Sequence, residues 1–418
     1  HTPSSPPPAR PSGPAAAMKL ACAITLASAS TASAFVPGGF GRRATALKMS
    51  AAPESGPVEE SRRGFVQTSV AGAAALTAAT LMPEAALAAK STAWRQVDLG
   101  ISETLYDISF DPAEKTHGYV VGAKGTFLET KNGGKSWTPR SFSNLDADEE
   151  INYRFEKVSC LNDEVWIIGK PAILLHSKDA GKNWERVPLS PKLPGEPNGI
   201  IALGSGEAEM TTSTGAIYST VNAGRNWKAL VKETIDATLN RISSSGVSGA
   251  SYFSGGIINI ARDADGTYIA VSSRGNFYLT WSPGDDFWIP HNRGTPRRIQ
   301  NMGFVNGKAA NGIWMSLNGG LLQIAKGGDL QADTPDFQSV PIKTGGYGII
   351  DLGWKGSDEI WAVGGGGTMY TSKDAGKSFK FDNSADDIPG NLYQVKFANN
   401  NGFVLGSDGV LLRYSGSV

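Results

Sequence analysis

The chain repeats the segment Ser177-Lys-Asp-Ala-Gly-Lys-Asn-Trp184 three further times, as Thr130-Lys-Asn-Gly-Gly-Lys-Ser-Trp137, Thr220-Val-Asn-Ala-Gly-Arg-Asn-Trp227 and Ser372-Lys-Asp-Ala-Gly-Lys-Ser-Phe379. In each copy an Asp or Asn can cap a turn through its side chain, and a Gly can adopt the positive φ that the turn requires. The aromatic residue that ends the copy can then pack between neighbouring sheets. The repeat therefore predicts four hairpin turns, each followed by a strand that an aromatic side chain anchors.

Paired apolar runs precede these hairpins. Val165–Gly169 and Ile173–Leu175, for example, stand before the copy that begins at Ser177. The turns between paired runs carry glycine, and these glycines are Gly125, Gly215, Gly275, Gly367 and Gly409. The order strand, turn, strand, hairpin, strand, repeated about every 45 residues, is typical of a four-stranded propeller blade.

Aromatic residues before the outermost strands give the number of blades. They are Trp94, Trp137, Trp184, Trp227, Trp288, Phe337 and Phe379. The last repeat, Leu392–Tyr414, has inner strands but no aromatic residue after it, whereas Trp94 has no inner strands before it. We therefore predict an all-β, seven-bladed β-propeller of four-stranded antiparallel blades, closed by the mature N-terminal strand, which completes the last blade.

The sequence leaves two features of this propeller undetermined. The spacing from Trp227 to Trp288 is longer than the others, which predicts a Ser/Gly-rich insertion at about 240–256, before the fourth blade. The sequence does not define the role of this insertion. It also leaves open the boundary of the fifth blade, around Phe337.

The first 88 residues are rich in Ala, Ser, Thr and Pro and lack strand patterning. We interpret residues 1–17, which precede Met18, as a leader. The apolar run Leu20–Thr31 then ends at Ala32-Ser33-Ala34, a cleavage pattern of signal peptides, and a basic stretch follows that has the composition of a transit peptide. The Ala-Ser-Ala-Phe-Val-Pro junction resembles the two-part presequence of algae with a secondary plastid.

A twin-arginine pattern, Arg62-Arg63, begins a further signal. The mildly apolar segment Val66–Leu81 follows it and leads to Ala86-Leu87-Ala88, which fits the twin-arginine route into the thylakoid lumen. A membrane anchor is the alternative, but the segment is short and rich in Gly, Ala and Thr, so it would span a bilayer poorly. We expect residues 1–88 to be removed, at sites that stay open, leaving a propeller of residues 89–418.

Charge and cysteine content narrow the classes of function. The first 88 residues hold seven basic and four acidic residues, so the remainder has a net charge of about −3, which argues against a general binder of polyanions. Cys160 is the only cysteine of the remainder, which therefore has neither an internal disulfide nor a thiolate metal cluster. Its histidines, His117, His176 and His291, are too scattered for a zinc site, and we expect no metal and no cofactor.

Several segments carry a resemblance to a known family. The hairpin repeat resembles the Asp box, or BNR repeat, of sialidase-type propellers. Seven segments resemble the photosystem II stability and assembly factors of cyanobacteria and plastids, and they are Tyr153–Phe155, Lys170–Leu175, Pro188–Gly195, Ala270–Gly275, His291–Arg293, Arg297–Gly303 and Gly402–Tyr414. Thr238–Arg241 with Ser251-Tyr252 resembles the eukaryotic branch. Cys160 stands where the family usually has an aromatic residue, and the region of Phe337 has diverged.

The resemblance implies a chaperone-like factor of the thylakoid lumen and no enzyme. Such a factor binds the newly made precursor of a reaction-centre core subunit and stabilises early photosystem II assembly intermediates. The resemblance also implies a monomer that is peripheral to the membrane and does not bind nucleic acid. Which peptide segment or pigment it contacts, how tightly, and when it is released stay open.

Propeller topology predicts where a partner would bind. The links between blades share one face with the turns between second and third strands, and the Asp boxes lie on the other face. Eight cations on the first face, over blades one to five, form the predicted partner-binding surface: Lys124, Lys170, Arg154, Arg241, Arg274, Arg293, Arg297 and Arg298. The resemblance singles out as an arginine patch Arg154, Arg274, Arg293, Arg297 and Arg298.

Two interpretations of these cations compete. Arg offers planar, bidentate recognition of carboxylates, so a cluster of them suits a carboxylate-bearing peptide. Alternatively they are ordinary solvated charges, neutralised in part by Asp146, Asp148, Glu149 and Glu150.

Two other functions are compatible with a propeller of this kind. An Asp-box glycoside hydrolase of the sialidase type would need an Arg triad with a Tyr/Glu pair, or two facing carboxylates at the channel mouth. The sequence offers no convincing pair. A passive subunit of the mature photosystem would, unlike an assembly factor, copurify with the finished complex.

Overall fold

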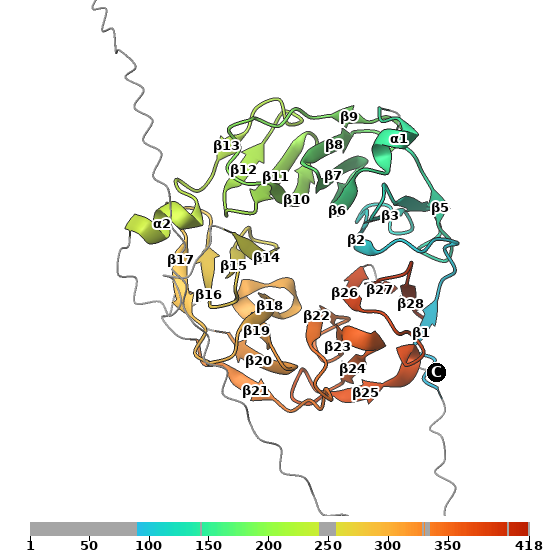
Figure 1. Cartoon of the computed structure of the whole chain (residues 1–418), viewed down its shortest axis with the longest axis vertical. Helices are drawn as coiled ribbons and strands as arrows, with labels where there is room; N and C mark the ends of the chain where they lie inside the picture. The colour runs from blue at the N-terminus through green and yellow to red at the C-terminus, as the bar shows by residue number, and fades with distance from the viewer. Residues whose placement is uncertain are drawn as a thin grey trace, which may run out of the picture. The chain divides into compact units, whose positions relative to one another are not determined.

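The computed structural model describes residues 90–142, 144–241, 256–327, 330, 335–398 and 401–416, and Pro83–Val418 forms one compact unit. Seven four-stranded antiparallel sheets stand around a central axis (Figure 1), which confirms the predicted fold class and the number of blades. The presequence at 1–88 and most of the insertion at about 240–256 lie outside the described residues. Both stay predictions.

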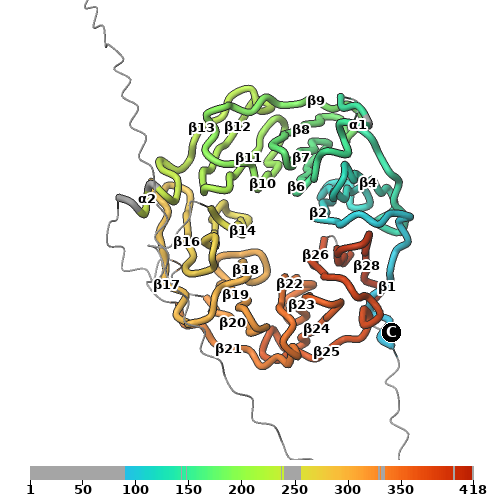
Figure 2. The backbone as a smooth tube through the Cα atoms, viewed as in Figure 1, coloured from blue at the N-terminus to red at the C-terminus, as the bar shows by residue number. Residues whose placement is uncertain are grey.

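Blades one to six each run from an inner to an outer strand in chain order, so the chain winds around the ring blade by blade (Figure 2). The strands of the first three blades are β2 (Leu105–Phe110), β3 (Gly118–Gly122), β4 (Phe127–Thr130) and β5 (Thr138–Pro139); β6 (Arg154–Leu161), β7 (Glu164–Lys170), β8 (Ile173–Ser177) and β9 (Glu185–Arg186); and β10 (Pro197–Gly204), β11 (Glu207–Thr212), β12 (Ile217–Thr220) and β13 (Lys228–Ala229).

Blades four to six repeat this order. Their strands are β14 (Ile257–Arg262), β15 (Tyr268–Ser272), β16 (Phe277–Trp281) and β17 (Ile289–Asn292); β18 (Ile299–Phe304), β19 (Gly312–Leu317), β20 (Leu321–Lys326) and β21 (Gln338–Val340); and β22 (Ile349–Trp354), β23 (Ile360–Gly364), β24 (Met369–Ser372) and β25 (Lys380–Asp382). The outer strand of the fifth blade thus begins directly after Phe337, where the sequence had left its boundary open.

The seventh blade joins the two ends of the propeller. Its first three strands are β26 (Leu392–Ala398), β27 (Asn401–Gly406) and β28 (Leu411–Tyr414), and its outer strand is β1 (Trp94–Gln96). β1 pairs antiparallel with β28 through Trp94 opposite Tyr414 and Gln96 opposite Leu412. The ring is therefore closed by strands of this unit alone.

The aromatic residues that begin the outer strands pack against the preceding blade. Trp184 contacts the Phe127 ring of blade one edge-on at 5.4 Å, and Trp227 contacts Trp166 of blade two at 6.3 Å between ring centroids. Burial is uneven, since Trp137, Trp227 and Phe337 are only half-buried whereas Trp94, Trp184, Trp288 and Phe379 are buried. These side chains fill the seams between sheets, so the apolar core is divided among the seams.

Helices are a small part of the described chain. α1 (Ala147–Glu150) lies in the link before blade two, and α2 (Ile235–Arg241) lies in the link before blade four. The other helical turns are the 3-10 helices η2 (Val305–Gly307), η3 (Ala309–Asn311), η4 (Gly365–Gly367) and η5 (Asn383–Ala385). None of the helices in the described ranges has the length and apolar character that crossing a bilayer requires.

Hydrogen bonds define two faces of the ring. On the box face, the Asp boxes bond the hairpins between first and second strands, as in Ala180 N to Asp163 O and Ala223 N to Gly206 O, both 2.8 Å. On the link face, the turns between second and third strands bond the following links. Two examples are Gly125 N to Tyr153 O at 2.8 Å and Ile299 N to Gly275 O at 2.9 Å.

Candidate functional site

The predicted partner-binding cations fall into two groups on the link face. Lys124, Arg154 and Lys170 lie at blades one and two, in the turn after β3, at the start of β6 and at the end of β7. The second group lies at blades four and five and comprises Arg274, Arg293, Arg297 and Arg298. The side chain of Arg241, at the end of α2, lies outside the described residues, so its role stays a prediction.

Backbone hydrogen bonds bring the second group together. Arg274 precedes Gly275, and Arg298 precedes Ile299, whose N–H donates to the Gly275 carbonyl at 2.9 Å. Arg274 and Arg298 therefore lie on either side of one contact between blades four and five. Arg297 Nη1 donates to the Asn318 carbonyl at 3.1 Å, which attaches the same link to the next turn of blade five.

Arg293 has a structural role within this group. Its Nε donates to the Thr295 carbonyl at 2.7 Å, and its Nη1 donates to the Asn276 carbonyl at 2.6 Å. Burial and the nearby charge of Arg298 lower the pKa of Arg293. The N–H groups of Arg293 are therefore used in hydrogen bonds that hold the link in place, and its charge adds to that of Arg298.

The remaining three arginines are available to a partner. We call Arg274, Arg297 and Arg298 the free arginine cluster, because their side chains are exposed and form no ion pair with any carboxylate of the described chain. Two exposed apolar side chains accompany the cluster on this face: Ile258 in the bulge of β14, 50% exposed, and Tyr347 just before β22, 53% exposed. Such a surface suits a peptide that has both a carboxylate and apolar side chains.

The cations at blades one and two, unlike the free arginine cluster, form ion pairs with acids. Arg154 Nη2 lies 2.5 Å from Glu156 Oε1, and Lys170 Nζ lies 3.2 Å from Glu156 Oε2. Lys124 lies 3.7 Å from Glu103. One acid on β6 thus pairs with two of the three cations and offsets one of their charges. The arginine patch is therefore split into a paired part and a free part.

The acid that neutralises Arg154 differs from those expected. Glu149 bonds Arg186 Nη1 at 3.0 Å and the Tyr153 hydroxyl, and Glu150 is buried and accepts from Phe142 N at 2.7 Å. The acidic stretch that the competing interpretation named therefore does not pair with Arg154 in the described chain. α1 turns these carboxylates toward their own link, and Glu156 is nearer because it lies in the bulge beside Arg154.

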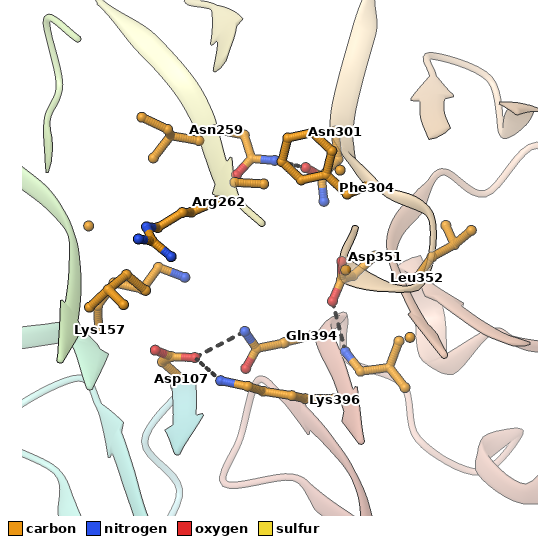
Figure 3. Close-up of a pocket in the computed structure, with 18 of the residues that line it drawn as sticks. Asp107, Lys157, Asn259, Arg262, Asn301, Phe304, Asp351, Leu352, Gln394 and Lys396 are labelled. Atoms are coloured by element: carbon orange, nitrogen blue, oxygen red, sulfur yellow. Dashed lines mark hydrogen bonds and ion pairs between the residues drawn. The ribbon is translucent and has the colours of Figure 1, made fainter. Parts of the chain in front are cut away.

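A central channel of about 620 Å³ opens beside these cations. A β-bulge near the start of every inner strand turns the residue that follows the bulge toward the channel. The seven residues at this position line the channel, and they are Asp107, Lys157, Gly199, Asn259, Asn301, Asp351 and Gln394 (Figure 3).

These channel residues join neighbouring blades. Asp107 accepts from Val158 N at 3.1 Å and from Gln394 Nε2 at 3.0 Å, and Asn301 Nδ2 donates to the Ile350 carbonyl at 2.7 Å. Sequence reasoning did not single them out. The available signal was a polar residue two positions after the first apolar residue of six inner strands, with Gly199 at this position in the other.

Asp351 is the most perturbed acid of the channel. Burial raises the pKa of Asp351 to about 7, against the hydrogen bonds that its carboxylate accepts from the amides of Val395 and Leu352. Val395 belongs to the next blade, so this carboxyl spans the seam between blades six and seven. The folded ring thus binds a proton here that the unfolded chain releases near pH 4.

We expect Asp351 to make stability fall as the pH rises. Between about pH 4 and pH 7 the folded state holds this proton and the unfolded state does not, so the free energy of unfolding decreases with pH. Because the carboxyl faces an open channel, we expect a loss of about 2 kcal/mol. Asp351→Asn keeps the acceptor for Val395 N and should remove this part of the pH dependence. The measurement is urea unfolding of both proteins at about pH 4.5, 6 and 8, values that span the interval between the pKa of Asp351 in the unfolded and in the folded state. Equal pH profiles of the two proteins would contradict the assignment.

Possible metal-ligating side chains are scattered over the described chain. No group of three or more His, Cys, Asp or Glu side chains suitable for a metal occurs there. Cys160 is buried, its sulfur contacts the Ser109 hydroxyl, and burial raises the pKa of its thiol to about 12. This thiol is therefore protonated at neutral pH and unsuited to nucleophilic chemistry.

The link face and the repeated blades place the chain among known proteins. The family model described as photosynthesis system II assembly factor YCF48 matches residues 86–415, which include all seven blades. The chain belongs to this family. A relative from Guillardia theta, described as a chloroplastic photosystem II stability/assembly factor HCF136, is 57% identical over 329 residues, which are 78% of this chain and 83% of that protein.

Two solved structures of the family have the same fold. YCF48 from Cyanidioschyzon merolae is 50% identical, with a TM-score of 0.73 over 77% of this chain and 98% of that one. A structure described as YCF48 bound to D1 peptide is 39% identical, with a TM-score of 0.66 over 77% of this chain and 94% of the other. The fold of this protein is thus the fold of the family.

Proposed function

We propose that this protein is a photosystem II assembly factor that binds the newly made precursor of a reaction-centre core subunit and stabilises early assembly intermediates. It acts by binding and does not turn over a substrate. It works in the lumen of the plastid thylakoid, as a monomer at the membrane periphery, after removal of the presequence. The relative described as chloroplastic supports the plastid, and the twin-arginine pattern Arg62-Arg63 supports the lumen.

The free arginine cluster is the observation that carries this proposal. Arg274, Arg297 and Arg298 offer three exposed guanidinium groups on one link-face seam, and the partly buried Arg293 reinforces their positive potential. Guanidinium groups without an acid partner bind carboxylates with little desolvation cost. A relative has been solved with a D1 peptide, so recognition of a core-subunit peptide is chemistry that this family performs.

Existing ion pairs distinguish the two groups of cations. Arg154 and Lys170 share Glu156, so a peptide carboxylate at blades one and two must displace an existing ion pair. Binding there costs the pairing energy, whereas binding at blades four and five does not. We therefore place the carboxylate of the partner at the free arginine cluster, and the paired group serves as a secondary contact.

Reversing Arg274, Arg297 and Arg298 to Glu should weaken binding of the precursor by at least about 100-fold, because attraction becomes repulsion at three positions. The test uses residues 83–418 and overlapping labelled peptides that cover the lumenal segments of the D1 precursor, with fluorescence anisotropy as the readout. Pull-down of the translated full-length precursor is a second readout.

Two matched variants make this experiment decisive. Reversing Lys135, Lys178 and Lys182, on the box face, changes the net charge equally and should leave peptide binding within about threefold. Reversing Arg154 and Lys170 should have an intermediate effect, since Glu156 already offsets them. Equal binding by the arginine triple variant and the unmodified protein would refute the assignment of the site.

A further inference from the structure

The box face carries a set of cations that the proposed function does not use. Each Asp box holds its second and sixth residues outward, and in the four boxes these positions contain seven cations and one valine. We call the seven the box cations: Lys131, Lys135, Lys178, Lys182, Arg225, Lys373 and Lys377. All seven side chains are exposed.

The box cations project from rigid loops. Asn132 Oδ1 accepts from the amides of Lys135 and Ser136, both at 3.0 Å, and Asp374 accepts from Ser378 N at 3.0 Å. Each box is also bonded to the first hairpin of its own blade, as in Ala375 N to Asp358 O at 3.1 Å. The capping acids are therefore committed to the loops, and the cations are held at the rim of one face.

These cations are largely without acid partners. Lys131 lies 3.5 Å from Glu129, whereas the other six form no ion pair with a carboxylate of the described chain. Asp163, Glu207 and Asp358 lie on the hairpins between first and second strands, which are nearer the axis, whereas Asp179, Asp374 and Glu185 lie at the periphery beside the boxes. The seven box cations outnumber these three peripheral acids. Positive charge is thus collected at the periphery of the face, over blades one, two, three and six.

The arc has a defined end. Blade four has no Asp box, and the turn at the equivalent place carries Asp285 and Asp286, of which Asp286 pairs with Lys232 at 2.7 Å. The box of blade three replaces the first lysine by Val221, which is 74% exposed. An exposed apolar side chain beside cations can reach the boundary of the acyl chains when the cations contact lipid headgroups.

We propose that the box face binds the surface of a membrane that contains anionic lipids, with the box cations against the headgroups and Val221 at the boundary of the acyl chains. Six of the seven cations are Lys, whose flexible, point-like charge suits a diffuse anionic surface better than a specific bidentate contact. They are spread along an arc from blade six through blade seven, which has no box, to blades one, two and three.

This binding mode leaves the link face open. The two faces lie at opposite ends of the blades, because strands alternate in direction between them. A protein resting on lipid through the box face would therefore keep Arg274, Arg297 and Arg298 exposed to a peptide. Membrane contact then concentrates the protein near its membrane-bound partner without competing for the same cations.

The test measures cosedimentation of residues 83–418 with vesicles of pure phosphatidylcholine and with vesicles of an equal mixture of phosphatidylcholine and phosphatidylglycerol. We expect binding to the mixed vesicles only, lost as salt is raised. Replacing Lys135, Lys178 and Lys182 by Gln should weaken binding to the mixed vesicles about 100-fold. The reason is that each loss of one to two positive charges near an anionic surface lowers the affinity about tenfold. Circular dichroism verifies that the variant is folded.

A matched variant removes the same number of charges from the other face. The variant in which Gln replaces Arg274, Arg297 and Arg298 should bind vesicles within about threefold of the unmodified protein. The lysine variant should leave peptide binding unchanged. Absence of binding to mixed vesicles, equal binding to neutral ones, or equal loss in both variants would overturn the proposal. Tight binding to soluble polyglutamate with no binding to vesicles would overturn it in favour of an acidic protein partner.

Discussion

Replacing Gly275 with alanine should lower the free energy of unfolding of the propeller by about 4 kcal/mol, because the new methyl group meets the backbone of the next blade. An ideal Cβ at Gly275 would lie 2.0 Å from the Ile299 carbonyl oxygen and 2.9 Å from the Ile299 nitrogen. Ile299 begins the inner strand β18 and donates its N–H to the Gly275 carbonyl. No flexible side chain can move to make room, so the contact between blades four and five must open.

Gly294→Ala is the matched control, since Gly294 lies in the link between the same two blades. Its φ is +65°, against +64° for Gly275, and nothing lies within 4 Å of an added Cβ. This variant should lose only about 1 kcal/mol, the cost of the left-handed conformation for alanine. Urea unfolding measures both. Equal losses would show that backbone conformation, and not the close approach of the blades, determines the effect.

The same substitution should affect partner binding. Gly275 itself contacts Ile299, and Arg274 and Arg298 immediately precede these two residues. If the seam opens, the three arginines of the free cluster no longer hold their relative positions, and the pre-organisation that supports affinity is lost. Gly275→Ala should therefore weaken peptide binding even under conditions where the protein remains folded, whereas Gly294→Ala should not.

Trp94→Ala should destabilise the ring by about 4 kcal/mol, as is usual for a buried tryptophan. Trp94 is 3% exposed and packs edge-on against Trp361 at 5.3 Å and Tyr414 at 5.1 Å between ring centroids. β1 contributes only three residues to the seventh blade. We therefore expect closure of the ring to depend more on the indole, which fills the seam between blades six and seven, than on backbone pairing.

Arg95 provides the comparison for Trp94, because it is the next residue of β1 and its side chain is exposed. Arg95→Ala keeps the strand pairing and should change stability by less than about 0.5 kcal/mol. Urea unfolding and limited proteolysis near residue 94 are the measurements. A loss for Trp94→Ala as small as that for Arg95→Ala would mean that the aromatic seam does not control closure.

The repeated features of this structure could be predicted from the sequence. A hairpin repeat with a terminal aromatic, from Ser177 to Trp184 in one copy, specifies a turn and the start of an outer strand by local backbone chemistry. Counting such aromatics therefore gave seven blades, including the diverged one at Phe337. The bulge at every inner strand was not predicted, because it depends on how the inner strands crowd around the axis and not on one residue type.

Sequence alone determined the all-β repeat, the number of blades, and the face on which each cation falls, because strand direction alternates strictly along the chain. Tertiary structure alone decided which of those cations are free. Arg154 and Arg274 look equivalent in the sequence, yet Glu156 lies within an ion-pair distance of the first and no described acid lies within reach of the second. Charge pairing depends on distances of a few ångströms between side chains of packed blades, and no local pattern encodes such distances.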